Sequence, residues 1–201
     1  ATWVWEEDGR IVGHYSAFPM PYLLDDRQVV AGNAVDAAIA PSHQGRRLFT
    51  PLAEALYADC AARGWPVVVC YATNPVAMQG VARAGVVWRP PLRLLANPLP
   101  FWVYGRAQEA LPYTQNGIDG LWRRTVERDG IVAGVDRGAA WWEWRYRQSP
   151  LGSYRVVSVD GAAAVLTKRG RFTAVLELLA DDGRAARRVL PLGAVTLAVD
   201  G

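Results

Sequence analysis

The stretch "AIAPSHQGRRLFTPLAEALYADCAARG", residues 38–64, decides the fold. It begins as an apolar strand, turns at Pro41 and continues as a polar, basic loop. Apolar residues then recur at every fourth position: Leu48, Leu52, Leu56 and Cys60. This spacing predicts an amphipathic helix that packs one face on a sheet and ends at Gly64. The first turn of a helix has unpaired N–H groups and a partial positive charge, so the basic loop is either an anion site or an ordinary solvated turn.

The composition is that of a folded protein. The chain has 201 residues, of which 51% are hydrophobic, which is enough for one large domain or two small ones, and no apolar run is long enough to span a membrane. The net charge of +3 suits phosphate-bearing small molecules as well as nucleic acid. The two cysteines have no metal-ligand spacing, which favours buried thiols. Without a visible signal peptide, we expect a cytoplasmic protein.

Strand patterns lie on both sides of the decisive stretch. Residues 2–20 alternate in polarity around Asp8-Gly9, which predicts a hairpin, and residues 29–41 predict a third strand. After the helix, "WPVVVCYAT" is typical of a strand covered on both faces, and "NPVAMQGVARAG" predicts a short helix. An extended segment follows to about residue 98. We therefore expect a mixed, mostly antiparallel sheet with flanking helices, in the α/β class.

The pattern changes near residue 99, and three regions are predicted. Residues 1–98 form the first domain, residues 99–138 a connecting helical region, and residues 139–201 a second domain. The second domain repeats the hairpin-then-strand order of the first, as "VWEEDGRIVG" and "VVSVDGAAAV" illustrate, which indicates an internal duplication.

Residues 1 to about 96 resemble the GNAT superfamily of acyl-CoA-dependent N-acetyltransferases. The resemblance is carried by the strand "VDAAIAP", the loop "QGRRLF", the helix to Gly64, and "NPVA" after the next strand. Gln44 matches the first position of the family's loop pattern. Arg47 stands where the pattern has its first Gly, and Phe49 stands where it has Gly or Ala. The loop is therefore a degenerate form of the family's phosphate loop.

The resemblance implies a binding site for acetyl-CoA as acyl donor, with no metal. The N–H groups of residues 45–49 would hold the pyrophosphate, and ordinary backbone angles at Arg47 and Phe49 would preserve their donation. The pantetheine arm would pair with the strand edge at residues 37–39, where the Ile39 N–H would polarise the thioester carbonyl. The cofactor-binding candidates are Ala37, Ala38, Ile39, Gln44, Gly45, Arg46, Arg47, Leu48, Phe49 and Asn74.

Acyl transfer to an amine also needs a base for the ammonium and an acid for the leaving thiolate. Asp36 is the first candidate base, because a buried carboxylate among alanines would be costly without a role; strand alternation places it on the opposite face from Val35. His14 is the second, because of its intrinsic pKa, although a solvent-facing or satisfied core histidine explains it equally well. The family's acid tyrosine is missing from the helix after Asn74, so Tyr71 and Cys70 are the nearest substitutes, or solvent fills the role.

The tryptophan-rich segment "WWEWRYRQSP" indicates packing in a core or between domains rather than an aromatic binding cage. By resemblance, it begins a partial second GNAT-like domain. No phosphate loop is visible there, so we expect a pseudo-domain that walls the acceptor pocket.

The sequence thus predicts an N-acyltransferase that transfers an acetyl group from acetyl-CoA to the amine of a small molecule by direct attack in a ternary complex. Two alternatives stay open: the same fold with a carrier- or tRNA-bound acyl donor, and a non-catalytic GNAT-like binding module. A membrane partner is not expected, nor is nucleic acid other than a tRNA-bound donor, because the arginines form no dominant patch. A homodimer and the identity of the acceptor amine are left open.

Overall fold

A computed structural model describes residues 1–71, 74–87, 93–96, 114–152, 154–169, 172–190 and 194–198. The chain divides into two compact units. The first consists of Ala1–Pro90 and Ala133–Val135, and the second of Pro91–Val132 and Asp136–Gly201. Both have the mixed α/β character predicted from the sequence, with mostly antiparallel sheets.

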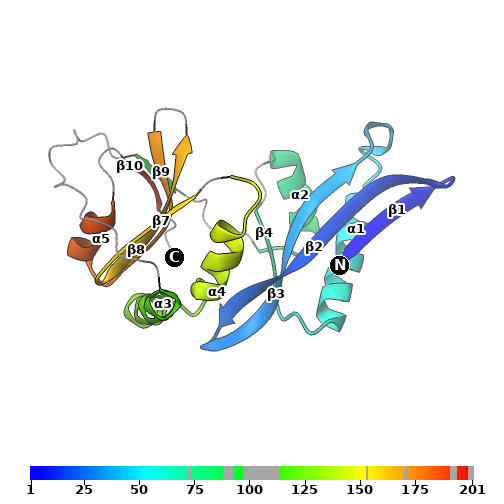
Figure 1. Ribbon diagram of the computed structural model, residues 1–201. Helices are drawn as coiled ribbons and strands as arrows, with labels where there is room; N and C mark the ends of the chain where they lie inside the picture. Colours follow the sequence, from blue (N-terminus) through cyan, green and yellow to red (C-terminus); the bar gives the residue numbers. More distant parts are fainter. Residues whose placement is uncertain are drawn as a thin grey trace. The chain divides into compact units, whose positions relative to one another are not determined.

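The first unit is built on a five-stranded sheet (Figure 1). Its strands are β1 (Thr2–Glu7), β2 (Arg10–Leu24), β3 (Arg27–Ile39), β4 (Val68–Cys70) and β6 (Ala133–Val135). The order is β1-β2-β3-β4, and β6 pairs with the far end of β2. The pairs β1–β2 and β2–β3 are antiparallel, whereas β3 and β4 are parallel.

The predicted turn at Asp8-Gly9 and a second turn at Asp25-Asp26 join these strands. Asp8 and Gly9 have φ of 51° and 73°, and Asp25 and Asp26 have φ of 47° and 59°. Two consecutive residues with positive φ match the right-handed twist of a hairpin, and Asp and Gly tolerate that conformation best. The sequence therefore fixes both hairpins locally.

Helix α1 (Phe49–Ala62) buries the face that the four-residue spacing predicts. Leu52, Leu56 and Cys60 are buried, and they pack in one cluster with Tyr15 of β2 and Ala34 of β3. Helix α2 (Pro75–Arg83) contacts α1 and begins where predicted, because the Asn74 carbonyl accepts the Met78 N–H at 3.0 Å. Helix α1 is the crossover connection between β3 and β4, which two parallel strands require.

A core substitution tests this packing. Leu56 is 0% exposed, so Leu56→Ala leaves a cavity beneath α1, and we expect it to lower the free energy of unfolding by about 2–5 kcal/mol. Urea unfolding measures the loss. Val87→Ala removes apolar atoms at a site that is 79% exposed in the same unit and should change stability by less than about 0.5 kcal/mol. Equal effects of the two changes would contradict the packing.

Strand β4 is shorter and less covered than predicted. Of its described residues, only Val68–Cys70 form a strand, and all three are half-buried rather than enclosed on both faces. Residues 72 and 73 of the predicted strand lie outside the described residues.

The second unit has a five-stranded sheet of its own, in the order β5-β10-β9-β8-β7. Its strands are β5 (Arg93–Ala96), β7 (Arg155–Val159), β8 (Ala162–Arg169), β9 (Phe172–Ala180) and β10 (Ala194–Ala198). Its helices are α3 (Gln115–Asp129), α4 (Ala139–Trp142), which continues as a π-helical turn (Glu143–Arg147), and α5 (Gly183–Val189).

Two assignments at the predicted domain boundary are wrong. Residues 93–96, predicted to close the first domain, form β5 and pair with β10 in the second sheet. Helix α3, predicted to belong to a connecting region, contributes Ile118, Leu121 and Trp122 to the core of the second unit. Residues 97–113 of the predicted connection lie outside the described residues.

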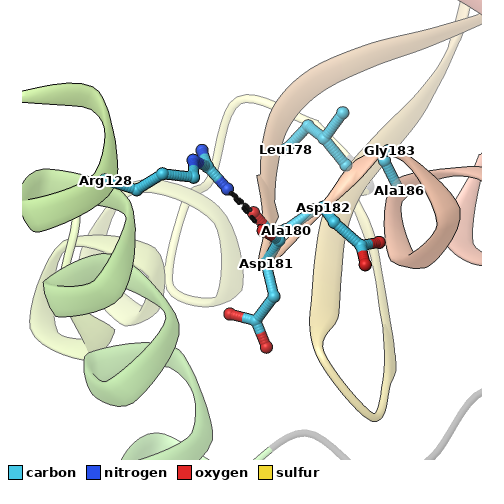
Figure 2. A pocket seen from close by; sticks show the side chains of 7 residues that line it. All are labelled: Arg128, Leu178, Ala180, Asp181, Asp182, Gly183 and Ala186. Atoms are coloured by element: carbon cyan, nitrogen blue, oxygen red, sulfur yellow. Dashed lines mark hydrogen bonds between the residues drawn. The ribbon is translucent and has the colours of Figure 1, made fainter.

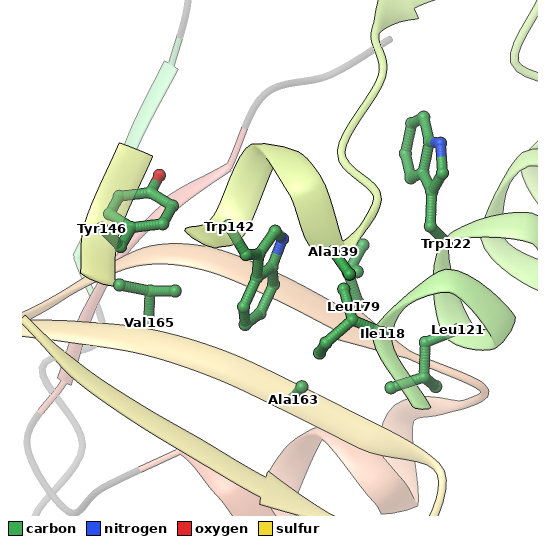
Figure 3. Close-up of a cluster of buried hydrophobic side chains, with 9 residues drawn as sticks. All are labelled: Ile118, Leu121, Trp122, Ala139, Trp142, Tyr146, Ala163, Val165 and Leu179. Carbon is green, nitrogen blue, oxygen red and sulfur yellow. The ribbon is translucent and has the colours of Figure 1, made fainter. Parts of the chain in front are cut away.

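The aromatic segment packs in the core, as predicted. Trp142 is 0% exposed and Tyr146 is buried, and both lie in the cluster shown in Figure 3, over Ala163 and Val165 of β8. Trp144 instead faces solvent. The change from α- to π-helical winding within this segment explains why its aromatic residues keep no single helical stripe.

The two units share an order of elements. In the first, two antiparallel pairs lead into β3, and α1 connects β3 to the parallel strand β4. In the second, β7, β8 and β9 form the same antiparallel series, and α5 connects β9 to the parallel strand β10.

Candidate functional site

Among the described residues, strand β3 has no partner along one edge at its carboxyl end. Its pairing with β4 ends at Ala34, opposite Cys70, but β3 continues to Ile39 while still paired with β2. In the described parts of the chain, no strand pairs with the other edge of residues 35–39. Ala37 and Ala38 are exposed and Ile39 is half-buried. An extended ligand can therefore add to this edge through main-chain hydrogen bonds.

A β-bulge lies in this segment. Val35 is opposite Ser16 and Ala38 is opposite His14, so the two residues between them on β3 face only Tyr15 on β2. One of the two is Asp36, which has φ of 54° and an exposed side chain. Bulges redirect side chains, and a positive φ in a residue other than glycine is uncommon enough to suggest a functional constraint.

The predicted difference in sidedness between Asp36 and Val35 stays a prediction: Val35 is half-buried, Asp36 is exposed, and the bulge begins at Asp36. The expected cost of burying the carboxylate does not apply, because Asp36 is exposed. Aspartate tolerates the left-handed conformation, so the bulge gives a structural reason for this residue beside the predicted catalytic one.

His14 lies on the neighbouring strand β2, paired with Val4 on one side and Ala38 on the other, and is half-buried. The adjacent Tyr15 packs in the core beneath α1. Because neighbouring side chains in a strand point to opposite faces, the His14 side chain lies on the face away from α1.

The basic loop between β3 and α1 has a positive φ, the left-handed conformation that favours glycine, at two positions. A short 3₁₀ turn, Pro41–His43, leads to Gly45 with φ of 80° and Arg47 with φ of 60°. The condition of ordinary backbone angles is therefore not met at Arg47: an arginine adopts the conformation for which the family's glycine is suited. The left-handed conformation costs an L-residue about 1–2 kcal/mol.

The first turn of α1 presents unpaired donors next to this loop. The first bond along the helix is from the Leu52 N–H to the Leu48 carbonyl, at 3.4 Å, so the N–H groups of Phe49 and Thr50 precede the helical ladder. Pro51 has no N–H, so it contributes no donor to this turn. The first turn holds no acidic residue, so the positive end of the helix is uncompensated there and suits an anion.

Two predicted ligands have structural roles as well. The Gln44 side chain donates from Nε2 to the Ile39 carbonyl at 3.1 Å, which ties the loop to the end of β3. The Phe49 ring packs on Tyr15, with ring centroids 5.2 Å apart. A Cβ at Gly80 of α2 would lie 2.7 Å from Phe49 Cδ1, so glycine there allows α2 to approach the start of α1. The role of Gly80 was not predicted from the sequence, because no local sequence pattern marks this contact.

The remaining candidates lie beyond β4. Tyr71 follows the strand directly and is 63% exposed. Asn74 is exposed just before α2. The roles assigned to Tyr71, Asn74 and the other candidates stay predictions, since no bound ligand tests them.

A contact between buried Tyr15 and half-buried Tyr57 was not anticipated. The hydroxyls of Tyr15 and Tyr57 are 3.4 Å apart between β2 and α1. Burial raises the pKa of both phenols above the usual value, and burial likewise raises the pKa of the Cys70 thiol. All three groups therefore remain protonated at neutral pH. The alternation of β2 and the four-residue spacing of α1 place each tyrosine, but only tertiary packing brings them together.

The second unit has a hollow of about 450 Å³ where β9 meets α5 (Figure 2). Its polar groups are engaged: Arg128 donates to the carbonyls of Ala180 and Asp181, and Asp182 accepts the Ala185 N–H at the start of α5. None of the predicted site residues lines it.

In the described part of the chain, no three His, Cys, Asp or Glu residues are grouped so that they could hold a metal ion. Nor does any helix there have the length and apolar character needed to cross a membrane.

Residues 1–80 match the family model described as an acetyltransferase (GNAT) domain. The open edge of β3, the loop and α1 all fall within this match. The N-terminal part of the chain is therefore a domain of the GNAT acetyltransferase superfamily.

Solved structures share the fold over almost the whole chain. Eis1 from Mycobacterium abscessus is 16% identical, with a TM-score of 0.59, covering 97% of this chain and 55% of that one. A GCN5-related N-acetyltransferase from Kribbella flavida is 11% identical, with a TM-score of 0.60, covering 90% and 47%. N-myristoyltransferase from Saccharomyces cerevisiae, with bound myristoyl-CoA, is 12% identical, with a TM-score of 0.54, covering 89% and 53%.

The chain spans about half the length of each of these proteins. No curated protein sequence matches it.

Proposed function

We propose that this protein is an N-acyltransferase that transfers an acetyl group from acetyl-CoA to the amine of a small molecule. The observation that carries the proposal is the open edge of β3 at residues 35–39, which leads directly into the basic loop and the uncompensated start of α1. An extended arm with a polyanionic end matches these two features in the same order along the chain. The membership of residues 1–80 in the GNAT superfamily supports this donor class.

In this proposal the donor lies along β3 and α1. The N–H groups of residues 45–49 and the Arg47 guanidinium hold the pyrophosphate, aided by the helix dipole. The pantetheine pairs with residues 37–39, and the Ile39 N–H faces the thioester oxygen, where negative charge develops. Asn74 contacts the arm from the start of α2. Acyl-CoA is also the ligand of the structurally similar N-myristoyltransferase.

The reaction proceeds by direct attack in a ternary complex. Asp36 or His14, on adjacent strands, accepts a proton from the substrate ammonium. The neutral amine nitrogen then attacks the thioester carbonyl carbon, the C–S bond breaks, and the nitrogen releases its surplus proton to solvent as the amide forms. The coenzyme A thiolate takes a proton from Tyr71, from Cys70 or from solvent. Tyr71 is exposed, and Cys70 is a protonated thiol at the last paired position of β4.

Calorimetric titration of acetyl-CoA into the protein tests the donor site, with dephospho-CoA as the comparison ligand. We expect micromolar binding that weakens without the 3′-phosphate, followed by acetylation in a screen of amines. Binding without turnover on any amine would favour the non-catalytic module. No binding of free acetyl-CoA would favour a carrier- or tRNA-bound donor.

We also infer that the second unit is a partial GNAT-like half without a donor site. The shared order of elements supports this inference, as does a bulge in β9, where Val165 and Leu166 pair with Glu177 and Val175 and leave Leu176 unpaired. The position equivalent to the basic loop carries Asp181 and Asp182 instead, beside the hollow of Figure 2. Two carboxylates there would repel a pyrophosphate.

A cytoplasmic location remains part of the proposal. Cys60 and Cys70 are free thiols, as expected in a reducing compartment.

A further inference from the structure

The β1–β2 hairpin extends past the end of β3 and reaches the basic loop. Strand β3 ends at Ile39, opposite Gly13, and the Ala40 N–H donates to the Val12 carbonyl at 2.8 Å. Strand β2 begins three residues before Gly13, and there the last pair of the hairpin is Glu7 with Arg10. The tip of the hairpin, with its acidic residues, therefore lies beside residues 41–48.

Glu7 makes two charged contacts with this loop. Its Oε2 accepts a hydrogen bond from Arg46 NH1 at 2.8 Å and lies 2.5 Å from His43 Nε2. The other ring nitrogen of His43, Nδ1, lies 2.8 Å from Ser42 Oγ, which fixes the orientation of the imidazole. Hydrogen bonds from Arg46 and His43 lower the pKa of the Glu7 carboxyl, so Glu7 is ionised at neutral pH.

Other hydrogen bonds also hold the loop. The His43 N–H already donates to the Ala40 carbonyl at 2.8 Å, and the Gln44 side chain bonds the Ile39 carbonyl. The Glu7–Arg46 pair is open to solvent, with side chains 43% and 51% exposed, and such pairs contribute little to stability. Its main effect is electrostatic: a carboxylate occupies the guanidinium of an arginine in the loop that we propose as the phosphate site.

We propose that Glu7 is a built-in counter-anion of the donor loop, which holds Arg46 while no donor is bound and competes with the donor's phosphates for the same guanidinium. The inference rests on the proposed function, because it concerns the affinity of that same site. A guanidinium pairs with carboxylate and phosphate through the same N–H groups, so the donor must displace Glu7 to use Arg46. A fixed negative charge beside the loop also disfavours ligands with few phosphate charges.

Glu7→Gln tests the competition. It removes the charge and keeps the shape, so we expect coenzyme A to bind about threefold to tenfold more tightly at low ionic strength, with the gain lost in about 0.5 M salt. Inorganic pyrophosphate serves as a second probe of the loop alone. Glu6→Gln is the matched control: Glu6 is exposed on the same strand and the net charge changes equally, but the dissociation constant should change less than about twofold.

A double-mutant cycle identifies Arg46 as the shared group. In an Arg46→Gln background, Glu7→Gln should no longer tighten coenzyme A binding, because the contested guanidinium is gone. Unchanged or weaker binding by Glu7→Gln, with normal binding by the wild type, would overturn the inference and leave the donor site intact. If neither probe binds either protein, the donor site and the inference fail together.

Discussion

We expect Asp36→Asn to lower kcat by about 10²- to 10⁴-fold, the usual contribution of a general base, while the affinity for acetyl-CoA stays within about twofold of the wild type. Asparagine tolerates the left-handed conformation that Asp36 adopts, so the bulge should persist and only the proton acceptor is lost. Steady-state kinetics with the best amine of the screen, together with calorimetry for acetyl-CoA, separates the two quantities.

Two further variants separate the loss of the proton acceptor from an effect on the backbone conformation. Asp36→Gly suits the φ of 54° even better and should be as inactive as Asp36→Asn. Asp36→Val is strained there and should lower the free energy of unfolding by about 1–3 kcal/mol as well. If Asn and Gly both retain kcat within about twofold, Asp36 serves the bulge alone, and His14→Gln becomes the decisive variant for the base.

The local elements of the first unit follow from the sequence because each is specified by neighbouring residues. Asp8-Gly9 specifies the first hairpin, and the spacing from Leu52 to Cys60 specifies the buried face of α1. The boundary between the units did not follow in this way. Strand β5 pairs with β10, about 100 residues later in the chain, and no local pattern near Arg93–Ala96 indicates that partner.

The position of the candidate site follows from the sequence, but its geometry does not. A strand that ends at Pro41 and a basic loop before a helix place the candidate site within residues 1–80, which match the GNAT domain model. The bulge at Asp36 depends on the register between β2 and β3, and the contact of Glu7 with Arg46 depends on how far the hairpin extends beyond β3. Alternation along a single strand contains neither of these facts.

The charge of the basic loop can be read from the sequence, but its backbone conformation cannot. Arg47 combines both, because its guanidinium adds positive charge and its backbone takes the φ of 60° that glycine would adopt without cost. Arg47→Gly therefore removes the charge while keeping the loop's shape, and it should leave the free energy of unfolding within about 1 kcal/mol of the wild type. It is the matched control for a reversal of charge at the same position.

Arg47→Glu should weaken coenzyme A binding about tenfold to 100-fold, which corresponds to the loss of a charged hydrogen bond of about 1.5–3 kcal/mol, with repulsion added. Arg47→Gly should show a smaller loss, because the N–H groups of the loop and of α1 remain. Calorimetry at two salt concentrations distinguishes the contribution of the Arg47 charge from that of the backbone N–H groups, since only the charge contribution shrinks as the salt concentration rises. If Arg47→Glu binds coenzyme A as tightly as the wild type, the pyrophosphate does not lie at this loop, and the donor site must be sought elsewhere on the chain.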